Sequence, residues 1–319
     1  MNIKNVFICG HRGMVGSAIH RILSTRSDVI VITAEKDKIN LLNQVEVRTF
    51  FLDMKIDEVY LAAAKVGGIY ANSNSPFDFI YENLVIQTNV IESAYNAGVK
   101  KLMFLGSSCI YPLNAKQPMV EECLLTGSLE QTNEPYAIAK IAGIKICESI
   151  NRQFGSTGGY DYRSVMPTNL YGPGDNYHPE NSHVIPGLIQ KMHDAKMSNS
   201  SHVAIWGSGR PKREFLHVDD AARASVHLME VESGKYWSVA SERVSHINIG
   251  SGIDITILEL AKLIKKVVGF NGDIILDKSK PDGSNKKLLD SSKAEKLGWK
   301  PIKSLRNGLI ETYNAFNRQ

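Results

Sequence analysis

Residues 5–16 read NVFICGHRGMVG, and this stretch decides the fold. The apolar run of residues 5–9 predicts a buried strand. The apolar positions that follow recur at helical spacing: Val15, Ile19, Ile22 and Leu23. Gly10, Gly13 and Gly16 stand between strand and helix, where glycines permit a tight turn and let backbone N–H groups at the helix start approach a pyrophosphate. The stretch therefore predicts a dinucleotide-binding turn.

Outward from this turn, short apolar runs alternate with helix-length amphipathic segments. The runs are residues 5–9, 29–33, 58–62 and 102–106. This alternation predicts an α/β fold with a doubly wound, Rossmann-type parallel sheet covered by helices on both faces. After about residue 165 Pro and Gly become frequent, which predicts a smaller α/β C-terminal substrate domain. We expect a cofactor domain at 1–168 and a mainly substrate-binding domain at 169–319, with about 210–250 returning to the first.

Composition sets the limits of function. The chain has 319 residues, 43% hydrophobic, with 37 Lys and Arg against 33 Asp and Glu. It can therefore bury a sizeable core, and the net charge of +4 does not indicate a nucleic-acid partner. The four cysteines lack metal-type spacing, so we expect free thiols and no metal site. No segment is typical of a signal peptide or a membrane span, which predicts a soluble cytoplasmic protein without a membrane partner.

Three further residues have the chemistry of a carbonyl reductase. Tyr136 and Lys140 are four residues apart near the start of a predicted helix, so they share one face. A nearby ammonium is expected to lower the pKa of a phenol, which would make Tyr136 a usable acid or base. Ser107 ends the strand of residues 102–106, where its hydroxyl could stabilise charge developing on a substrate oxygen.

The residues after the second predicted strand bear on the choice of cofactor. Residues 33–40 read TAEKDKIN. A carboxylate there, Glu35 or Asp37, would accept hydrogen bonds from the adenosine ribose of NAD. Lys36 together with Arg12 would instead neutralise the 2'-phosphate of NADP. The register leaves both open, and the two cations favour NADP.

Longer words in the sequence narrow the assignment. They are GHRGMVGSAI, LAAAKVGGI, FLGSSCIYP, NEPYAIAKIAGIK, RSVMPTNLYGP, NSHVIP, WGSG, REFLHVDD, and SKPDGS with KKLLD. In these words the chain resembles the GDP-L-fucose synthases, a family of the extended short-chain dehydrogenase/reductase superfamily. The resemblance implies an NADPH-dependent homodimer that converts GDP-4-keto-6-deoxy-D-mannose to GDP-L-fucose by 3,5-epimerisation and then 4-keto reduction.

The resemblance also implies the cofactor and catalytic residues. Those holding the cofactor would be Gly10, His11, Arg12, Gly13, Met14, Val15, Gly16, Lys36, Leu105, Gly106, Ser107, Ser108, Lys140, Pro167, Thr168, Asn169, Leu170 and His183. Ser107, Tyr136 and Lys140 would carry the reduction. Cys109 and His183 would exchange protons in the epimerisation, which needs a group on either face of the sugar because C3 and C5 each lose and regain a proton beside the ketone.

For the GDP-sugar, the resemblance points to five residues: Asn169, Lys191, Trp206, Arg213 and Lys287. Two features depart from the family. Lys191 stands where an arginine is expected and so lacks bidentate phosphate geometry. The loop of residues 154–160 is longer and richer in glycine than expected. By analogy with the superfamily, the dimer interface is expected on two long helices near residues 77–96 and 135–154.

Three alternatives remain open at this point. A 4,6-dehydratase would place an Asp-Glu pair after the strand-end hydroxyl, where this chain has Ser108 and Cys109. A UDP-sugar 4-epimerase needs no separate thiol and imidazole pair. A protein that only senses NADP would be expected to have lost Tyr136 or Lys140, and both are present.

Overall fold

The computed structural model describes residues 3–178, 182–280, 282 and 284–318. Its centre is a six-stranded parallel sheet in the order β2-β1-β3-β4-β5-β9. The strands are β1 (Lys4–Cys9), β2 (Val29–Ile32), β3 (Glu58–Leu61), β4 (Lys101–Leu105), β5 (Asp161–Pro167) and β9 (His246–Ile249). The four strands predicted from the sequence are confirmed to within one residue at each end.

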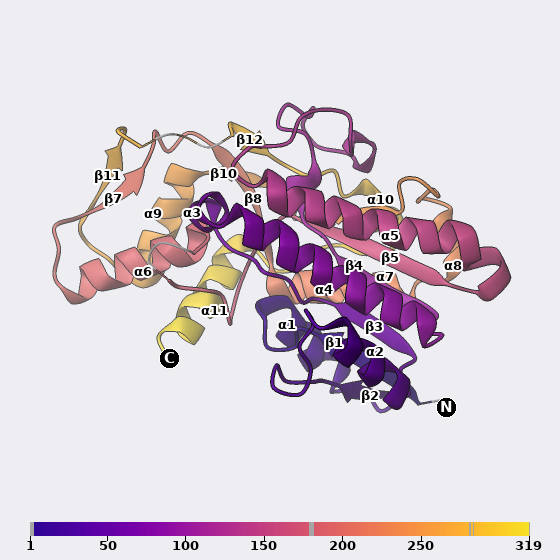
Figure 1. Cartoon of the computed structure of the whole chain (residues 1–319). Coiled ribbons are helices and arrows are strands. Elements are labelled where there is room, and N and C mark those ends of the chain that lie inside the picture. The colour runs from indigo at the N-terminus through magenta and orange to yellow at the C-terminus, as the bar shows by residue number, and fades with distance from the viewer. Residues whose placement is uncertain (1–2, 179–181, 281, 283, 319) are drawn as a thin grey trace.

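Helices cover both faces of this sheet, as predicted. Along β1, Val6 and Ile8 face a core shared with α1 (Met14–Leu23) and α7 (Val218–Glu230). Phe7 and Cys9 face the opposite core. The helices on that side are α2 (Gln44–Asp53), α4 (Pro76–Asn96) and α5 (Glu134–Gly158). Figure 1 shows α4 and α5 side by side across it. Strands buried on both faces explain the continuous apolar runs.

The strand order fixes where a ligand can bind. β2 and β3 pair with opposite sides of β1, so the chain reverses direction across the sheet at β1. In open α/β sheets the carboxyl ends of the strands at such a reversal border the ligand crevice. The glycines that follow β1 and the segment that follows β3 meet there.

A second, smaller core lies at one end of the sheet (Figure 1). Three helices contribute to it: α6 (Val184–Met197), α9 (Ile257–Val268) and α11 (Leu305–Phe316). Its strands are β6 (Asn169–Tyr171), β7 (His202–Trp206), β8 (Lys212–His217), β10 (Asp254–Thr256), β11 (Asp273–Asp277) and β12 (Lys286–Lys287). β8 pairs with β6, β10 and β12, and β7 pairs with β11.

The chain passes between the two cores more than once. After β8 it returns to the main sheet through α7, α8 (Ser233–Trp237) and β9, and it enters that core again at α10 (Ser292–Lys296). The remaining short helix in these regions, α3 (Ile69–Asn74), precedes α4. Among the described residues, no helix is both long enough and apolar enough to cross a membrane.

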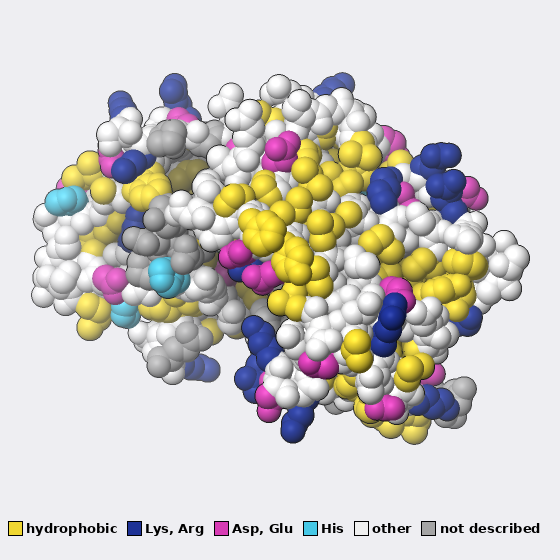
Figure 2. All heavy atoms as spheres, viewed as in Figure 1, with side chains coloured by type: hydrophobic (Ala, Val, Ile, Leu, Met, Phe, Trp, Pro, Cys, Tyr) yellow, Lys and Arg dark blue, Asp and Glu magenta, His cyan; other side chains and the backbone are white. Residues whose placement is uncertain are grey.

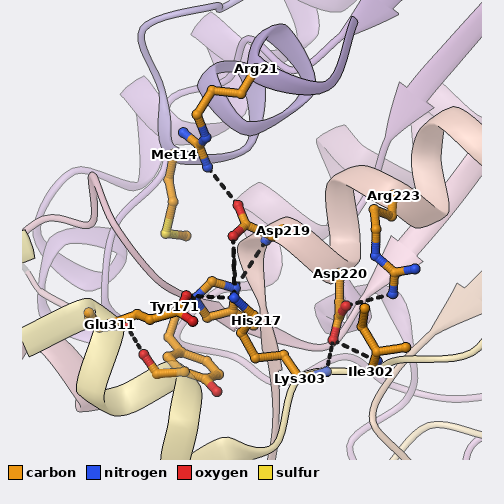
Figure 3. Close-up of polar contacts among 12 residues, drawn as sticks. Met14, Arg21, Tyr171, His217, Asp219, Asp220, Arg223, Ile302, Lys303 and Glu311 are labelled. Carbon is orange, nitrogen blue, oxygen red and sulfur yellow. Dashed lines mark hydrogen bonds and ion pairs between the residues drawn. The ribbon is translucent and has the colours of Figure 1, made fainter. Parts of the chain in front are cut away.

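Charged side chains fix α7 to both cores (Figure 3). Arg21 of α1 donates to Asp219 Oδ1 at 2.6 Å, and Lys303 Nζ lies 2.5 Å from Glu311 Oε2 of α11 and 3.7 Å from Asp219 Oδ2. Asp220 accepts the N–H groups of Ile302 and Lys303. The buried His217 lies among these groups in an arrangement that resembles a metal site. The Lys303 ammonium supplies the positive charge there, so we interpret the cluster as a structural link.

Candidate active site

Two positions of the glycine turn accept no residue with a side chain. Gly10 has a φ of +90°, and a Cβ there would lie 2.7 Å from the backbone N of Ala63. A Cβ at Gly16 would lie 2.1 Å from the carbonyl oxygen of Gly10. α1 begins after Gly13, which has no side chain to cap the first N–H groups. The turn therefore fits a pyrophosphate at the helix start.

The structure places Glu35, and not Asp37, beside this turn. Glu35 Oε2 lies 2.7 Å from Arg12 Nε, and its Oε1 lies 3.3 Å from His11 Nε2. Burial opposes ionisation of the Glu35 carboxyl, but the hydrogen bonds from Arg12 and His11 outweigh it and lower the pKa. Lys36 is exposed. The carboxylate and one of the two predicted phosphate-binding cations are thus paired with each other.

The strand end after β4 carries the predicted oxyanion residue. Gly106 donates its N–H to Val165 of β5 at 2.9 Å. Ser107 then ends the extended backbone, and its Oγ accepts the N–H of Cys109 at 3.4 Å. The short 3-10 helix η1 (Ser108–Ile110) follows, so strand and turn together place Ser107 and Cys109 at the carboxyl edge of the sheet.

Lys140 of α5 reaches the same edge. Its side chain is 4% exposed, and Nζ donates to the carbonyl oxygen of Leu105 at 2.8 Å. Burial lowers the pKa of this ammonium to about 8, against an opposing effect of Cys109. The Nζ atom lies 5.7 Å from the centroid of the Tyr136 ring. Helical spacing thus brings Tyr136 and Lys140 together as predicted.

The expected effect of Lys140 on Tyr136 is wrong for this structure. Burial, with a smaller contribution from Cys109, raises the pKa of the Tyr136 phenol above its usual value. Lys140 is itself desolvated and turned toward Leu105, so its charge does not compensate for the burial of the phenol. Tyr136 is therefore protonated at neutral pH and is placed to donate its proton.

Cys109 completes a cluster of four predicted catalytic side chains. Cys109 is 8% exposed, and burial raises the pKa of its thiol. A hydrogen bond with Ser107 and the charges of Lys287 and Lys140 act in the opposite direction. His183 is the exposed residue immediately before α6, and among the described residues no hydrogen bond or ion pair joins it to these four side chains.

The end of β5 meets β8 through a residue that the sequence reasoning missed. Pro167 ends β5, and Thr168 Oγ1 and Asn169 Nδ2 both donate to the carbonyl oxygen of Glu214. The Glu214 side chain is fully buried and accepts the N–H groups of Gly252 and Leu289. Glu214 therefore holds three segments at the site: the end of β5 through its main-chain carbonyl, and the segments of Gly252 and Leu289 through its carboxylate. A charged residue within the apolar strand REFLHV was the signal for it.

Predicted substrate residues gather around Trp206 and on β8 and β12. Trp206 is 60% exposed, and Lys191 Nζ lies 5.2 Å from its ring centroid. Lys280, which the sequence reasoning missed, lies 5.5 Å from the same ring. Arg213 and Lys287 are register partners on adjacent strands. Burial lowers the pKa of both, and the charge of Lys287 lowers the pKa of the Cys109 thiol.

Lys287 and Lys140 thus act on a site that holds a phenol, a thiol and a hydroxyl, and further cations lie at Trp206 and on β8. Arg213, Lys287 and Lys191 can bind a diphosphate, and the exposed face of Trp206 can stack on a base or a ribose. Leu105 to Ser108 stand at the end of β4, two strands from β1 and its glycine turn, and the charge of Lys287 acts on Cys109 directly after them. The arrangement suits acid–base chemistry and hydride transfer on a nucleotide-bound sugar.

Comparison with known proteins agrees with this geometry. The model of the NAD dependent epimerase/dehydratase family matches residues 6–250. A GDP-L-fucose synthase of Escherichia coli strain K12 is 57% identical over 316 residues, which cover 99% of this chain and 97% of the relative. A solved GDP-6-OMe-4-keto-L-xylo-heptose reductase from C. jejuni is 34% identical, with a TM-score of 0.92 and coverage of 100% and 99%.

A second solved structure carries a cofactor. It is a GDP-L-fucose synthetase from Naegleria fowleri bound to NADP, 25% identical, with a TM-score of 0.88 and coverage of 100% of this chain and 95% of that one. The family match extends over most of the chain, and the E. coli relative shares more than half of its residues. The chain therefore belongs to the NAD dependent epimerase/dehydratase family and, within it, to the GDP-L-fucose synthases.

Proposed function

We propose that this protein is an NADP-dependent enzyme that makes GDP-L-fucose from GDP-4-keto-6-deoxy-D-mannose. Epimerisation at C3 and C5 precedes reduction at C4. The observation that carries the proposal is the cluster of Ser107, Cys109, Tyr136 and Lys140 at the edge of the sheet, beside a turn that fits a dinucleotide. The 57% identity to a GDP-L-fucose synthase supports the substrate.

Epimerisation needs an acid and a base on opposite faces of the sugar ring. The C4 ketone acidifies the protons at C3 and C5, so a base can remove either one to give an enolate. Cys109 and His183 divide this work: one removes the proton, and the other returns a proton to the opposite face. The Tyr136 phenol and the Ser107 hydroxyl donate hydrogen bonds to the enolate oxygen.

Reduction uses the same oxygen site. NADPH, when bound, supplies a hydride to C4. Tyr136, whose pKa is raised by burial, donates its proton to the oxygen as the alcohol forms. Lys140 holds the strand end through the Leu105 carbonyl and places a positive charge near the phenol. This charge does not outweigh the burial of the phenol, but it reduces the cost of the phenolate left behind.

An assay of substrate choice tests this function. We expect NADPH oxidation with GDP-4-keto-6-deoxy-D-mannose and none with UDP-sugars. The product is checked by chromatography against authentic GDP-L-fucose. Absence of NADPH oxidation with the GDP-sugar, together with turnover of a UDP-sugar, would exclude the proposal.

A second candidate function is C4 reduction without epimerisation. The likeness to a solved 4-keto-heptose reductase favours it as the alternative. Reaction in D2O separates the two, because epimerisation introduces solvent deuterium at C3 and C5 and simple reduction does not. We expect deuterium at both carbons of the product, and a product without it would favour the reductase.

We also propose that the enzyme is a homodimer formed through α4 and α5. Figure 2 shows a broad hydrophobic area on the face where Figure 1 places these helices. Phe77 is 69% exposed, Tyr81 51% and Ile138 42%. The Phe77 and Tyr81 rings stack on each other with centroids 5.3 Å apart. An exposed apolar area of this kind is typical of an interface between subunits.

Light scattering after gel filtration tests the dimer. Tyr81→Glu places a charge in the area, so we expect the variant to elute as a monomer while the wild-type protein elutes as a dimer. Leu52→Glu on α2 is the control, because Leu52 is 73% exposed but lies on a different helix. A wild-type monomer, or dissociation by both variants alike, would contradict the proposed interface.

A further inference from the structure

The carboxylate of Glu35 forms an ion pair with the guanidinium of Arg12 in the glycine turn. Its oxygens lie 2.7 Å from Arg12 Nε and 3.3 Å from His11 Nε2. Arg12 has 78% of its side chain exposed and Glu35 has 40%. The contact is therefore an accessible ion pair on the surface of the turn, and a ligand can compete for it.

The pair lies where the two nicotinamide cofactors differ. Glu35 follows the carboxyl end of β2, next to β1 and its glycines. In folds of this kind the adenosine ribose lies at that strand end, and NADP differs from NAD there by a 2'-phosphate. A carboxylate at this position accepts hydrogen bonds from ribose hydroxyls and repels a phosphate. A cation attracts the phosphate.

This chain places both kinds of group at the same point. Arg12 is a predicted partner of the 2'-phosphate, yet Glu35 neutralises it. Lys36 is exposed, and among the described residues it has no carboxylate within ion-pair distance. A 2'-phosphate therefore meets one available ammonium, one guanidinium that must first be released, and one negative charge.

We infer that Glu35 competes with the 2'-phosphate of NADP for Arg12, so that it weakens the preference for NADP over NAD and lets the enzyme accept both. The inference rests on the proposed function, because that function makes this turn an NADP site. With NAD, no phosphate competes, and Glu35 is available to a ribose hydroxyl. With NADP, Arg12 must exchange Glu35 for the phosphate.

Binding of cofactor fragments tests this without catalysis. Calorimetry with 2',5'-ADP and 5'-AMP isolates the effect of the 2'-phosphate, and NADP+ and NAD+ give the effect on the whole cofactor. In Glu35→Gln we expect 2',5'-ADP and NADP+ to bind about 3- to 10-fold more tightly at low salt. The gain should shrink as salt increases, because the site is exposed. NAD+ should bind less tightly, and 5'-AMP should be unchanged.

Asp37→Asn is the matched control. It removes the same charge two residues further along an exposed loop, without a hydrogen bond or ion pair to Arg12. We expect the affinity of this variant for 2',5'-ADP and NADP+ to increase by less than half as much as that of Glu35→Gln. An equal gain would show that net charge, and not the Glu35 contact, sets the affinity, and would overturn the inference.

Unchanged or weaker binding of 2',5'-ADP to Glu35→Gln would also overturn it. So would failure of both proteins to bind NADP+, since the turn would then not be an NADP site. The proposed function is tested separately, by turnover of the GDP-sugar. Loss of that turnover with the fragment result intact would remove the substrate assignment and leave the role of Glu35 standing.

Discussion

Opposing influences meet at the thiol of Cys109. Burial raises its pKa, and Ser107, Lys287 and Lys140 partly offset this effect. The group therefore stays largely protonated at neutral pH, while a small thiolate fraction can act as the base. Proton transfer by a positioned group contributes about 10²- to 10⁴-fold to a rate, so loss of the thiol should stop one half of the chemistry.

Cys109→Ser tests that role. Serine keeps the size and the hydrogen bond with Ser107, but its hydroxyl does not ionise in this range. We expect exchange of solvent deuterium into C3 and C5 to fall at least 100-fold, with NADP+ affinity unchanged. NMR of the recovered GDP-sugar measures the exchange. A wild-type exchange rate in the variant would show that Cys109 is not part of the proton-transfer pair.

Lys287 provides a test of pH dependence. Its charge lowers the pKa of the Cys109 thiol, so Lys287→Gln should raise that pKa further. The rise of exchange rate with pH should then move to higher pH, with partial recovery of rate in alkaline buffer. Arg213→Gln is the control: Arg213 is the register partner of Lys287, but it is not among the groups that act on the thiol. It should raise KM without moving the profile.

Sequence predicted the positions of these residues in the fold better than their ionisation. Helical spacing was enough to bring Tyr136 and Lys140 together, and the strand end placed Ser107. The sign of the pKa shift of Tyr136 was wrong because it depends on burial by elements far along the chain. The pairing of Glu35 with Arg12 was equally out of reach, since an irregular loop has no periodicity to fix its register.

At the scale of elements, the short helix η1, which carries Cys109, is held in place by Tyr111, the residue that follows it. Tyr111 is 3% exposed, its hydroxyl donates to Asn248 Oδ1 at 2.5 Å, and the same hydroxyl lies 3.1 Å from His246 Nε2. Asn248 in turn donates to the carbonyl oxygens of Met119 and Asp290. η1 is thus anchored to β9 by a buried network, and Tyr111 positions the turn on which Cys109 sits.

Tyr111→Phe removes this anchor without creating a cavity. The partners of the hydroxyl lose a buried hydrogen bond, so we expect a loss of about 1 to 3 kcal/mol in stability. We also expect about 10-fold slower exchange at C3 and C5, with unchanged NADP+ affinity. Tyr162→Phe is the control, because Tyr162 also donates a buried hydrogen bond, to Val99, away from η1. Tyr162→Phe should lose similar stability and keep the wild-type exchange rate. Equally slowed exchange in the two variants would contradict a positioning role for Tyr111.

At the scale of the whole molecule, the main sheet was predictable and the link between the cores was not. Continuous apolar runs identify buried parallel strands from local pattern alone. The contact of Arg21 with Asp219 joins residues 198 positions apart, and Lys303, which lies just before α11, is 3.7 Å from Asp219 at the start of α7 (Figure 3). No local pattern contains such pairs, so the sequence indicated a second domain without showing how it is held.

Buried histidine makes the stability of the whole molecule sensitive to acid. Burial, aided by the charges of Lys145 and Lys293, lowers the pKa of His246 to about 3. The unfolded chain takes up a proton at this residue near pH 6.5, whereas the folded protein does not. The contribution of the neutral His246 to stability is therefore fully present above pH 6.5 and is lost as the pH falls below it. Buried Glu121 and Glu214 have raised pKa values and act with the opposite sign.

A variant isolates the histidine from these carboxyls. One residue with such a shift costs about 2 kcal/mol between pH 7 and pH 5. We expect His246→Gln to lose about that much less stability than the wild-type protein over this interval, whatever its stability at pH 7. Urea unfolding at both pH values gives the two differences. His202→Gln, at an exposed position on β7, should keep the wild-type loss. If the wild-type protein and His246→Gln lost the same unfolding free energy between pH 7 and pH 5, protonation of His246 would not contribute to the loss, and other groups would control it.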